Sequence, residues 1–143
     1  MRALPPDSLA LARLVIAEEL EPNQATDAEG RAALRVCEKL RHSLTNLIGA
    51  VGFRLLLARA LSLAKDKAPW LGKLVLLGDG VLECPPEAEA TLNQKEAREA
   101  ATSLVAELLG LLTLFIGAAL TQQLVRETWP QASFNVTDGR SKL

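Results

Sequence analysis

The sequence predicts a mainly α-helical fold, and three observations lead to that prediction. The apolar residues are mostly Leu and Ala, there is no Tyr, and aromatic residues make up 3% of the chain, a composition that favours helices over sheets. Apolar residues recur at steps of three and four along two long segments, and prolines fall at the segment ends. We therefore expect a helical bundle built on two long helices, at about 28–66 and 93–129, with a short N-terminal helix and a small β-hairpin at about 73–83.

The short N-terminal helix is predicted to start at Pro6 and Asp7 and to stop before Pro22. Proline and aspartate are favoured in the first turn of a helix, whereas a proline cannot continue one. Thr26 and Glu29 then have the spacing of a capping box, in which each side chain satisfies a backbone donor of the other residue. The first long helix should begin there.

The first long helix carries an apolar stripe and should end before Pro69, because the residue that precedes a proline is pushed out of the α region. The stripe consists of Leu34, Cys37, Leu40, Leu44, Leu47, Val51, Leu55, Ala58 and Ser62. Gly49 and Gly52 lie in its middle, and a glycine costs a helix about 1 kcal/mol relative to alanine. The two glycines indicate either a kink or a place where another backbone comes close.

Between the long helices, two short apolar runs at 74–77 and 81–82 flank Gly78, Asp79 and Gly80. Glycine and aspartate tolerate the backbone angles of tight turns, so the segment is expected to form a β-hairpin, with an irregular apolar loop as the alternative. Two strands alone are only marginally stable in water. The hairpin is therefore expected to lie on the helices or to extend the sheet of a partner.

The second long helix is predicted to begin at a capping box formed by Asn93 and Glu96, with Thr91 and Gln94 as a shifted alternative, and to end before Pro130. A chain of 143 residues has the size of one domain, so residues 1–130 are expected to form a single helical domain. The remaining residues, 131–143, are polar and contain glycine, and we expect a C-terminal tail there.

Small residues form a stripe along the second long helix, where they allow another helix to approach closely. The stripe consists of Thr102, Ala106, Gly110, Thr113, Gly117 and Thr121. Two such apolar helices hold more apolar surface than the rest of a short chain can cover, and a large exposed apolar patch usually marks an interface. We therefore expect a non-enzymatic interaction or assembly protein that forms a homodimer or a higher oligomer, or binds another protein, with a self-sufficient monomeric bundle as the alternative. The predicted interface residues are Leu44, Gly49, Gly52, Ala106, Gly110, Thr113 and Gly117.

Charged residues interrupt both apolar helices. Arg54 and Arg59 lie in the first helix, and Glu107 lies in the second. Because an unpaired buried ion costs several kcal/mol, an ion pair between Glu107 and one of these arginines would lock the register of the two helices. The alternative is that each charge lies at the rim of the bundle, with its aliphatic stem over apolar surface.

An uncharged run covers residues 108–125 and raises the question of membrane insertion. A spanning helix needs about twenty predominantly apolar residues, whereas the strictly apolar part of this run, 108–120, is shorter. The first turns of the same helix, at 95–99, carry the charges of a soluble amphipathic helix. The sequence therefore disfavours a membrane partner, and membrane association is kept as an alternative function.

His42 is the only histidine, and Asn46 follows it by about one helical turn. The segment LRHSLTNLIGAV resembles the phosphoacceptor box of sensor histidine kinases and histidine phosphotransfer proteins in its His, in the Asn four residues later and in its apolar pattern, although Ser43 replaces the usual acidic residue. The resemblance implies a helical carrier in which His42 accepts a phosphoryl group and Arg41 supplies positive charge. Histidine phosphotransfer is therefore the alternative function from a different class.

No further catalytic, metal or cofactor site is predicted. One histidine cannot complete a zinc site with Cys37 and Cys84, which we interpret as buried, reduced thiols. A formal net charge of -1, with carboxylates among the helix cations, disfavours nucleic-acid binding.

The expected location is the cytoplasm. Prolines near the N-terminus interrupt the apolar run that a signal peptide needs, and the Ala, Leu, Arg and Gly content is typical of a GC-rich bacterial gene. The peroxisomal matrix is the alternative for a eukaryotic chain, because Ser141, Lys142 and Leu143 spell a peroxisomal address.

Overall fold

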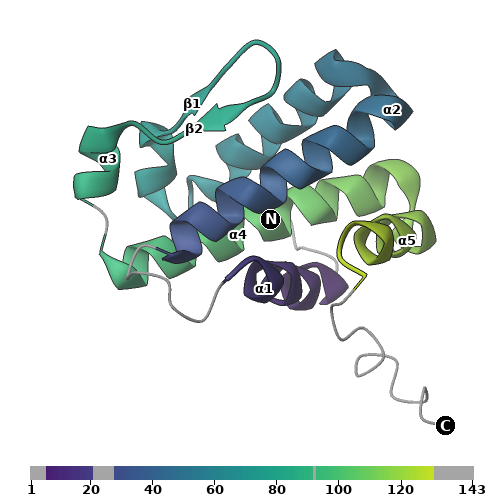
Figure 1. Cartoon of the computed structure of the whole chain (residues 1–143), viewed down its shortest axis with the longest axis horizontal. Coiled ribbons are helices and arrows are strands. Elements are labelled where there is room, and N and C mark those ends of the chain that lie inside the picture. The colour runs from purple at the N-terminus through teal and green to yellow at the C-terminus, as the bar shows by residue number, and fades with distance from the viewer. Residues whose placement is uncertain (1–5, 21–27, 92, 131–143) are drawn as a thin grey trace, which may run out of the picture.

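The computed structural model describes residues 6–20, 28–91 and 93–130, and it confirms a mainly α-helical fold with a two-stranded hairpin (Figure 1). The elements are α1 (Pro6–Glu19), α2 (Ala28–Ala64), a 3-10 helix (Pro69–Lys73), β1 (Val75–Leu76), β2 (Leu82–Glu83), α3 (Pro86–Ala90), α4 (Gln94–Ile116) and α5 (Ala118–Thr128). Thr26, and with it the first predicted capping box, lies outside the described residues, as does the predicted tail at 131–143.

The helix boundaries follow the local signals of the sequence. The first helix starts at Pro6, as predicted, and ends at Glu19, before Pro22. At the start of α4, the backbone N–H of Glu96 donates to Asn93 Oδ1 at 2.7 Å, and the backbone N–H of Asn93 donates to Glu96 Oε1 at 3.4 Å. The capping box predicted from this spacing is therefore confirmed.

Each long apolar segment is broken at one glycine. Gly49 interrupts α2 with φ 82° and ψ 163°, and Gly117 separates α4 from α5 with φ 93° and ψ 155°. Side chains disfavour this combination of angles, which is open essentially to glycine alone. The kink predicted near Gly49 is confirmed, whereas the helix predicted over 93–129 is found as two helices, because Gly117 leaves the α region.

Both glycine turns lie at the same end of the molecule, on the right in Figure 1. The first half of α2 and the whole of α4 run toward this end, where each chain segment turns and enters a second helix of different direction. Gly52, in contrast, stays helical, and a Cβ there would meet the side chain of Ile48 in the same helix at 3.3 Å. The close approach of another backbone that was considered for Gly49 and Gly52 is therefore not found at either glycine.

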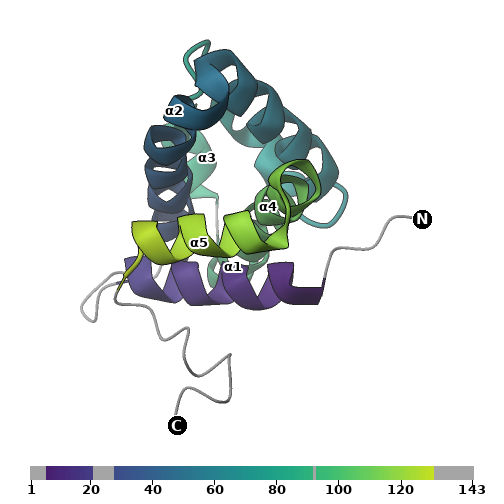
Figure 2. The same cartoon turned by 90° about the vertical axis from the view of Figure 1, so that its right-hand side faces the viewer.

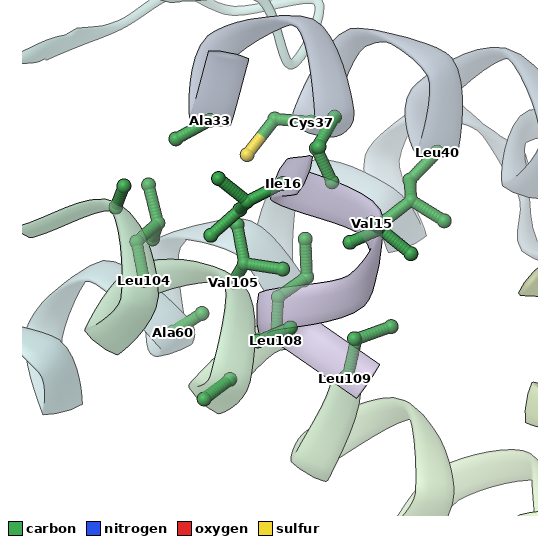
Figure 3. Close-up of a cluster of buried hydrophobic side chains, with 14 of the residues drawn as sticks. Val15, Ile16, Ala33, Cys37, Leu40, Ala60, Leu104, Val105, Leu108 and Leu109 are labelled. Atoms are coloured by element: carbon green, nitrogen blue, oxygen red, sulfur yellow. The ribbon is translucent and has the colours of Figure 1, made fainter. Parts of the chain in front are cut away.

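The core forms around α4, which packs against α1, α2 and α5. Figure 3 shows Val15 of α1, Leu40 of α2 and Leu108 of α4 among the side chains that converge there. Small residues on α4, such as Ala101 and Ala106, are buried in this core. Ala106 and Gly110 of the predicted stripe of small residues are therefore buried in the protein's own core.

The β-hairpin lies on the helices rather than standing free. Its two strands pair antiparallel, with Val75 opposite Glu83 and Leu76 opposite Leu82. Leu82 is buried, and Gly80 in the turn lies against the ring of Phe53 in α2. The first of the two packing arrangements expected for the hairpin is therefore the one observed.

Replacing either turn glycine by alanine is expected to destabilise the fold by about 1–3 kcal/mol, because alanine is strained at these backbone angles. No atom lies within 4 Å of the position that a Cβ would occupy at either glycine, so the cost is one of backbone conformation rather than of crowding. Urea unfolding of Gly49→Ala and Gly117→Ala measures this cost.

Gly78→Ala is the matched control, because Gly78 also has open space around it but does not have a positive φ. Its free energy of unfolding should stay within about 0.5 kcal/mol of that of the wild type. Equal stabilities of Gly49→Ala, Gly117→Ala and Gly78→Ala would contradict the role assigned to the two turns.

Candidate functional site

The two glycine turns belong to segments with the same sequence pattern. Leu44, Thr45, Ile48, Gly49 and Ala50 recur in the same order and at the same spacing as Leu112, Thr113, Ile116, Gly117 and Ala118. In both segments the threonine hydroxyl donates to the backbone carbonyl one turn earlier, from Thr45 to Arg41 at 2.6 Å and from Thr113 to Leu109 at 2.9 Å. Sequence and hydrogen bonding therefore make the two turns equivalent.

The equivalence extends into the core. When the two segments are aligned on their glycines, Ala33 corresponds to Ala101, and Leu40 corresponds to Leu108. All four of these side chains are buried. An internal repeat thus covers a helix, a glycine turn and the start of a second helix. The signal is visible in the sequence alone and identifies both turns, but the apolar periodicity of the two helices conceals it.

Large apolar side chains are exposed around both turns. Val51 and Leu114 each expose 69% of their surface, and Phe115 exposes 64%. The set comprises Leu47, Val51 and Leu55 of α2, Leu114 and Phe115 of α4, and Leu120 of α5, and we call the surface that these six residues define the glycine-turn end. Figure 2 views the molecule from this side, with the bend of α2 at the top and the passage from α4 to α5 below it.

The predicted interface residues fall into two groups. Leu44, Ala106 and Gly110 are buried inside the protein's own core, so a second molecule cannot reach them in this fold. Gly49 and Gly117 are exposed at the turns, and Gly52 and Thr113 are half-buried nearby. Only the part of the predicted interface that surrounds the glycines is accessible.

The charges inside the apolar helices lie at different depths. Glu107 is buried, Arg54 is half-buried and Arg59 is exposed. The rim position considered for all three therefore describes Arg59 but not Glu107. Pairing of Glu107 with Arg54 or Arg59 stays a prediction.

His42 and Asn46 are both exposed on α2. Glu38 lies between Arg41 and His42: its carboxylate accepts from Arg41, and its Oε2 lies 3.2 Å from His42 Nε2. The hydrogen bond from Arg41 lowers the pKa of Glu38 below its ordinary value, and the neighbouring His42 adds to this effect. Arg41 is thus engaged by Glu38, and phosphotransfer through His42 stays a hypothesis that rests on the sequence resemblance.

Glu19 forms a polar cluster that the sequence pattern did not indicate. This buried carboxylate at the end of α1 accepts from Trp129 Nε1 at 2.8 Å and pairs with Arg35 and Lys39 of α2. Burial alone would raise the pKa of Glu19, but the hydrogen bonds from Lys39 and Trp129 outweigh it, and the pKa lies below its ordinary value. Because its partners lie on α2 and just after α5, Glu19 ties three helices together.

Two of the pockets among the described residues differ in size and in lining. One apolar pocket of about 30 Å³, lined in part by Trp70, Cys84 and Leu104, has the volume of about one water molecule. An open cleft of about 330 Å³ contains Lys73 and Glu96, but these side chains bond to Thr91 and to the backbone of Asn93. Within the described ranges no group of three or more His, Cys, Asp or Glu side chains is placed to hold a metal ion.

Two helices of the described chain are long and apolar enough to cross a membrane by length and composition, namely residues 31–64 and 94–116. Their surroundings differ. In the apolar 18-residue stretch of α4, more than half of the residues are buried in the protein, whereas in that of α2 less than a quarter are buried. The core position of α4 accounts for its apolar character. Most residues in the apolar stretch of α2 are not buried, so a position in the core does not explain why that stretch is apolar.

Comparison of the chain with protein-family models, with curated proteins and with solved structures finds no match.

Removing the Glu19 carboxylate is expected to weaken the fold. Glu19→Ala leaves the buried Trp129 N–H without its acceptor and should cost about 1–3 kcal/mol in urea unfolding at neutral pH. Glu18→Ala is the matched control, because Glu18 is exposed on the same helix turn. A Glu19→Ala variant as stable as Glu18→Ala would contradict the role assigned to the cluster.

The same carboxylate predicts a pH dependence. The pKa of Glu19 is lower in the folded protein than its ordinary value of 4.5, so its contribution is fully present above that value and is lost as the pH falls through the folded-state pKa. Glu19→Gln, which keeps an acceptor oxygen but does not titrate, should lose less stability than the wild type between neutral pH and about pH 3. Parallel losses for the two proteins would contradict this assignment.

The two cysteines are expected to react differently. Burial raises the pKa of the Cys37 thiol to about 12, whereas Cys84 is half-exposed, which corrects the prediction that both thiols are buried. A thiol reagent should label Cys84 in the native protein and label Cys37 only after unfolding. Mass spectrometry of wild type and Cys84→Ser checks this, and rapid native labelling of Cys84→Ser would contradict it.

Proposed function

We propose that this protein is a non-enzymatic interaction and assembly protein that docks through its glycine-turn end. The observation that carries the proposal is the exposure of six large apolar side chains around two equivalent turns at one end of the molecule. Removing apolar surface from water stabilises a complex by about 25 cal/mol per Å². A partner that covers this end would therefore gain binding energy from every one of these side chains.

The accessible surface differs from the one that the stripe of small residues suggested. Ala106 and Gly110 are buried in the core of the protein, so association through them would require the core to open. Docking at the turns leaves the core intact. Self-association, if the protein undergoes it, is therefore expected at the glycine-turn end.

The two turns are well suited to docking because little has to become ordered on binding. Gly49 and Gly117 fix the direction of the chain, and the hydroxyls of Thr45 and Thr113 are bonded to the turn before. A surface that already holds its bound shape avoids much of the entropic cost of association. Val51 and Phe115 are thus presented next to fixed turns rather than on flexible loops.

The double variant Val51→Ser and Phe115→Ser is expected to lose the apolar character of this end while it keeps the core, because both side chains are exposed. Its fluorescence with anilinonaphthalene sulfonate should fall to less than about half of the wild-type value, and it should elute earlier from a hydrophobic-interaction column.

Val75→Ser is the matched control, because Val75 is an exposed apolar residue on the hairpin. It should behave like the wild type in both measurements. If the double variant and the wild type bind the dye equally, the glycine-turn end is not an apolar docking surface and the proposed function is wrong.

A further inference from the structure

We propose that the partner of the glycine-turn end is the surface of an anionic lipid bilayer, into whose headgroup region both turns insert together. This inference rests on the proposed function and names the class of partner. It concerns docking at the membrane surface rather than a helix that spans the membrane.

The charge pattern around the glycine-turn end points to an anionic partner. No Asp or Glu lies between Glu38 and Asp66, or between Glu107 and Glu127, so the stretches of sequence on both sides of each turn lack carboxylates. The first of these stretches carries the cations Lys39, Arg41, Arg54, Arg59 and Lys65. Lys39 pairs with Glu19, and Arg41 pairs with Glu38 and also interacts with Asp79. The cations of this stretch that lie next to its exposed apolar residues are therefore Arg54 and Arg59.

Arg54 carries the clearest sign of an absent anion. It is half-buried between the exposed residues Val51 and Leu55, and its Nε is buried without a hydrogen-bond partner among the described residues. An unsatisfied donor of a charged group is costly, and a guanidinium binds phosphate oxygens through parallel hydrogen bonds. A lipid phosphate that binds the guanidinium from the surface requires the Arg54 side chain to rotate outward, which would free the buried Nε to donate while Val51 and Leu55 enter the apolar layer.

A second copy of the chain fits this end less well than a bilayer does. Two glycine-turn ends placed face to face would bury apolar surface, but they would also bring Arg54 and Arg59 of both copies together with no carboxylate from either stretch. Like charges at such an interface oppose association. An anionic bilayer offers both the apolar layer and the counter-charge, and each basic residue near its surface strengthens binding about fivefold.

The arrangement of the helices suits shallow insertion. Both turns lie at one end, so they can meet the same flat surface at the same time (Figures 1 and 2). Leu47 and Phe115 are exposed, and each lies two residues before the glycine of its turn. Deeper insertion is opposed by the core, because α4 is covered by α1 and α2 along most of its length. Polar residues such as Gln122 follow the second turn closely and are suited to the headgroup layer.

Sedimentation with lipid vesicles tests the inference on the full chain. The probes are phosphatidylcholine vesicles with and without one third phosphatidylglycerol. The wild type should bind the anionic vesicles at least about tenfold more tightly than the neutral ones, and added salt should weaken the binding. The double variant Val51→Ser and Phe115→Ser should stay in the supernatant with both vesicles.

A second double variant separates the charge from the apolar contact. Arg54→Gln with Arg59→Gln should weaken binding to the anionic vesicles by about twenty-fold and leave binding to neutral vesicles unchanged. Its control, Arg13→Gln with Lys67→Gln, removes two exposed charges outside the glycine-turn end and should bind like the wild type. Circular dichroism and the elution volume show whether each variant is folded.

Two outcomes overturn the inference in distinguishable ways. If the wild type does not sediment with either vesicle but still binds dye at the turns, the proposed function stands and the partner is a protein, with a second copy indicated when light scattering gives a mass above that of the monomer. If the wild type sediments and the Val51→Ser and Phe115→Ser variant sediments equally, the contact lies elsewhere. If that variant also matches the wild type in dye binding, both the inference and the proposed function are wrong.

Discussion

A helix as apolar as α4 has to be covered, and the other long helices of the described chain are placed to cover it. α1 and α2 pack along it, and α5 folds back from its end. Small side chains at Ala101, Ala106 and Gly110 let these neighbours come close enough to exclude water. The uncharged run at 108–125 is therefore divided between a buried part in the core and an exposed part at the turn. The exposed part is the surface available for function.

The two glycine turns follow from the same constraint. A straight continuation of α2 or α4 would carry an apolar helix away from the core, so each segment turns back at a residue that tolerates positive φ. The turn keeps both helices on the core but leaves its own flanking residues uncovered, because no other element of the described chain reaches beyond this end (Figure 1). Exposure of Val51 and Phe115 is thus a consequence of how the chain buries Leu44 and Leu112.

Polar contacts hold the remaining helices in place at positions away from the turns. Glu19 joins α1 to α2 and to Trp129. The hydroxyl oxygens of Ser43 and Thr128 lie 3.2 Å apart and link α2 to α5. Arg31 and Glu89 pair across α2 and α3. Charges that are paired in this way serve the fold, whereas Arg54 and Arg59 lie among apolar residues in a stretch without carboxylates. This separation of paired and apolar surfaces underlies the proposal that one end of the molecule docks at a bilayer.

The sequence by itself determined the features that depend on neighbours within a few residues. Pro6 begins a helix, Asn93 and Glu96 form a capping box, and Gly49 bends α2, because backbone angles and local hydrogen bonds set each of these. The mainly helical class follows from the same local patterns. The repeat that contains both glycines was also present in the sequence, as the shared Ile-Gly-Ala of 48–50 and 116–118.

Only the tertiary structure decided which faces of those helices meet. Leu44 and Gly110 are predicted interface residues that lie inside the core, and Glu19 gains its role from Trp129, which is distant in the sequence. Gly117 ends α4 within a segment predicted as one helix, whereas Gly52, predicted as part of a kink or a close approach, stays helical. These outcomes depend on contacts between residues that are distant in the sequence. Such contacts form where the free energy gained by burial exceeds the entropy lost in ordering the chain, and a local sequence pattern does not contain that information.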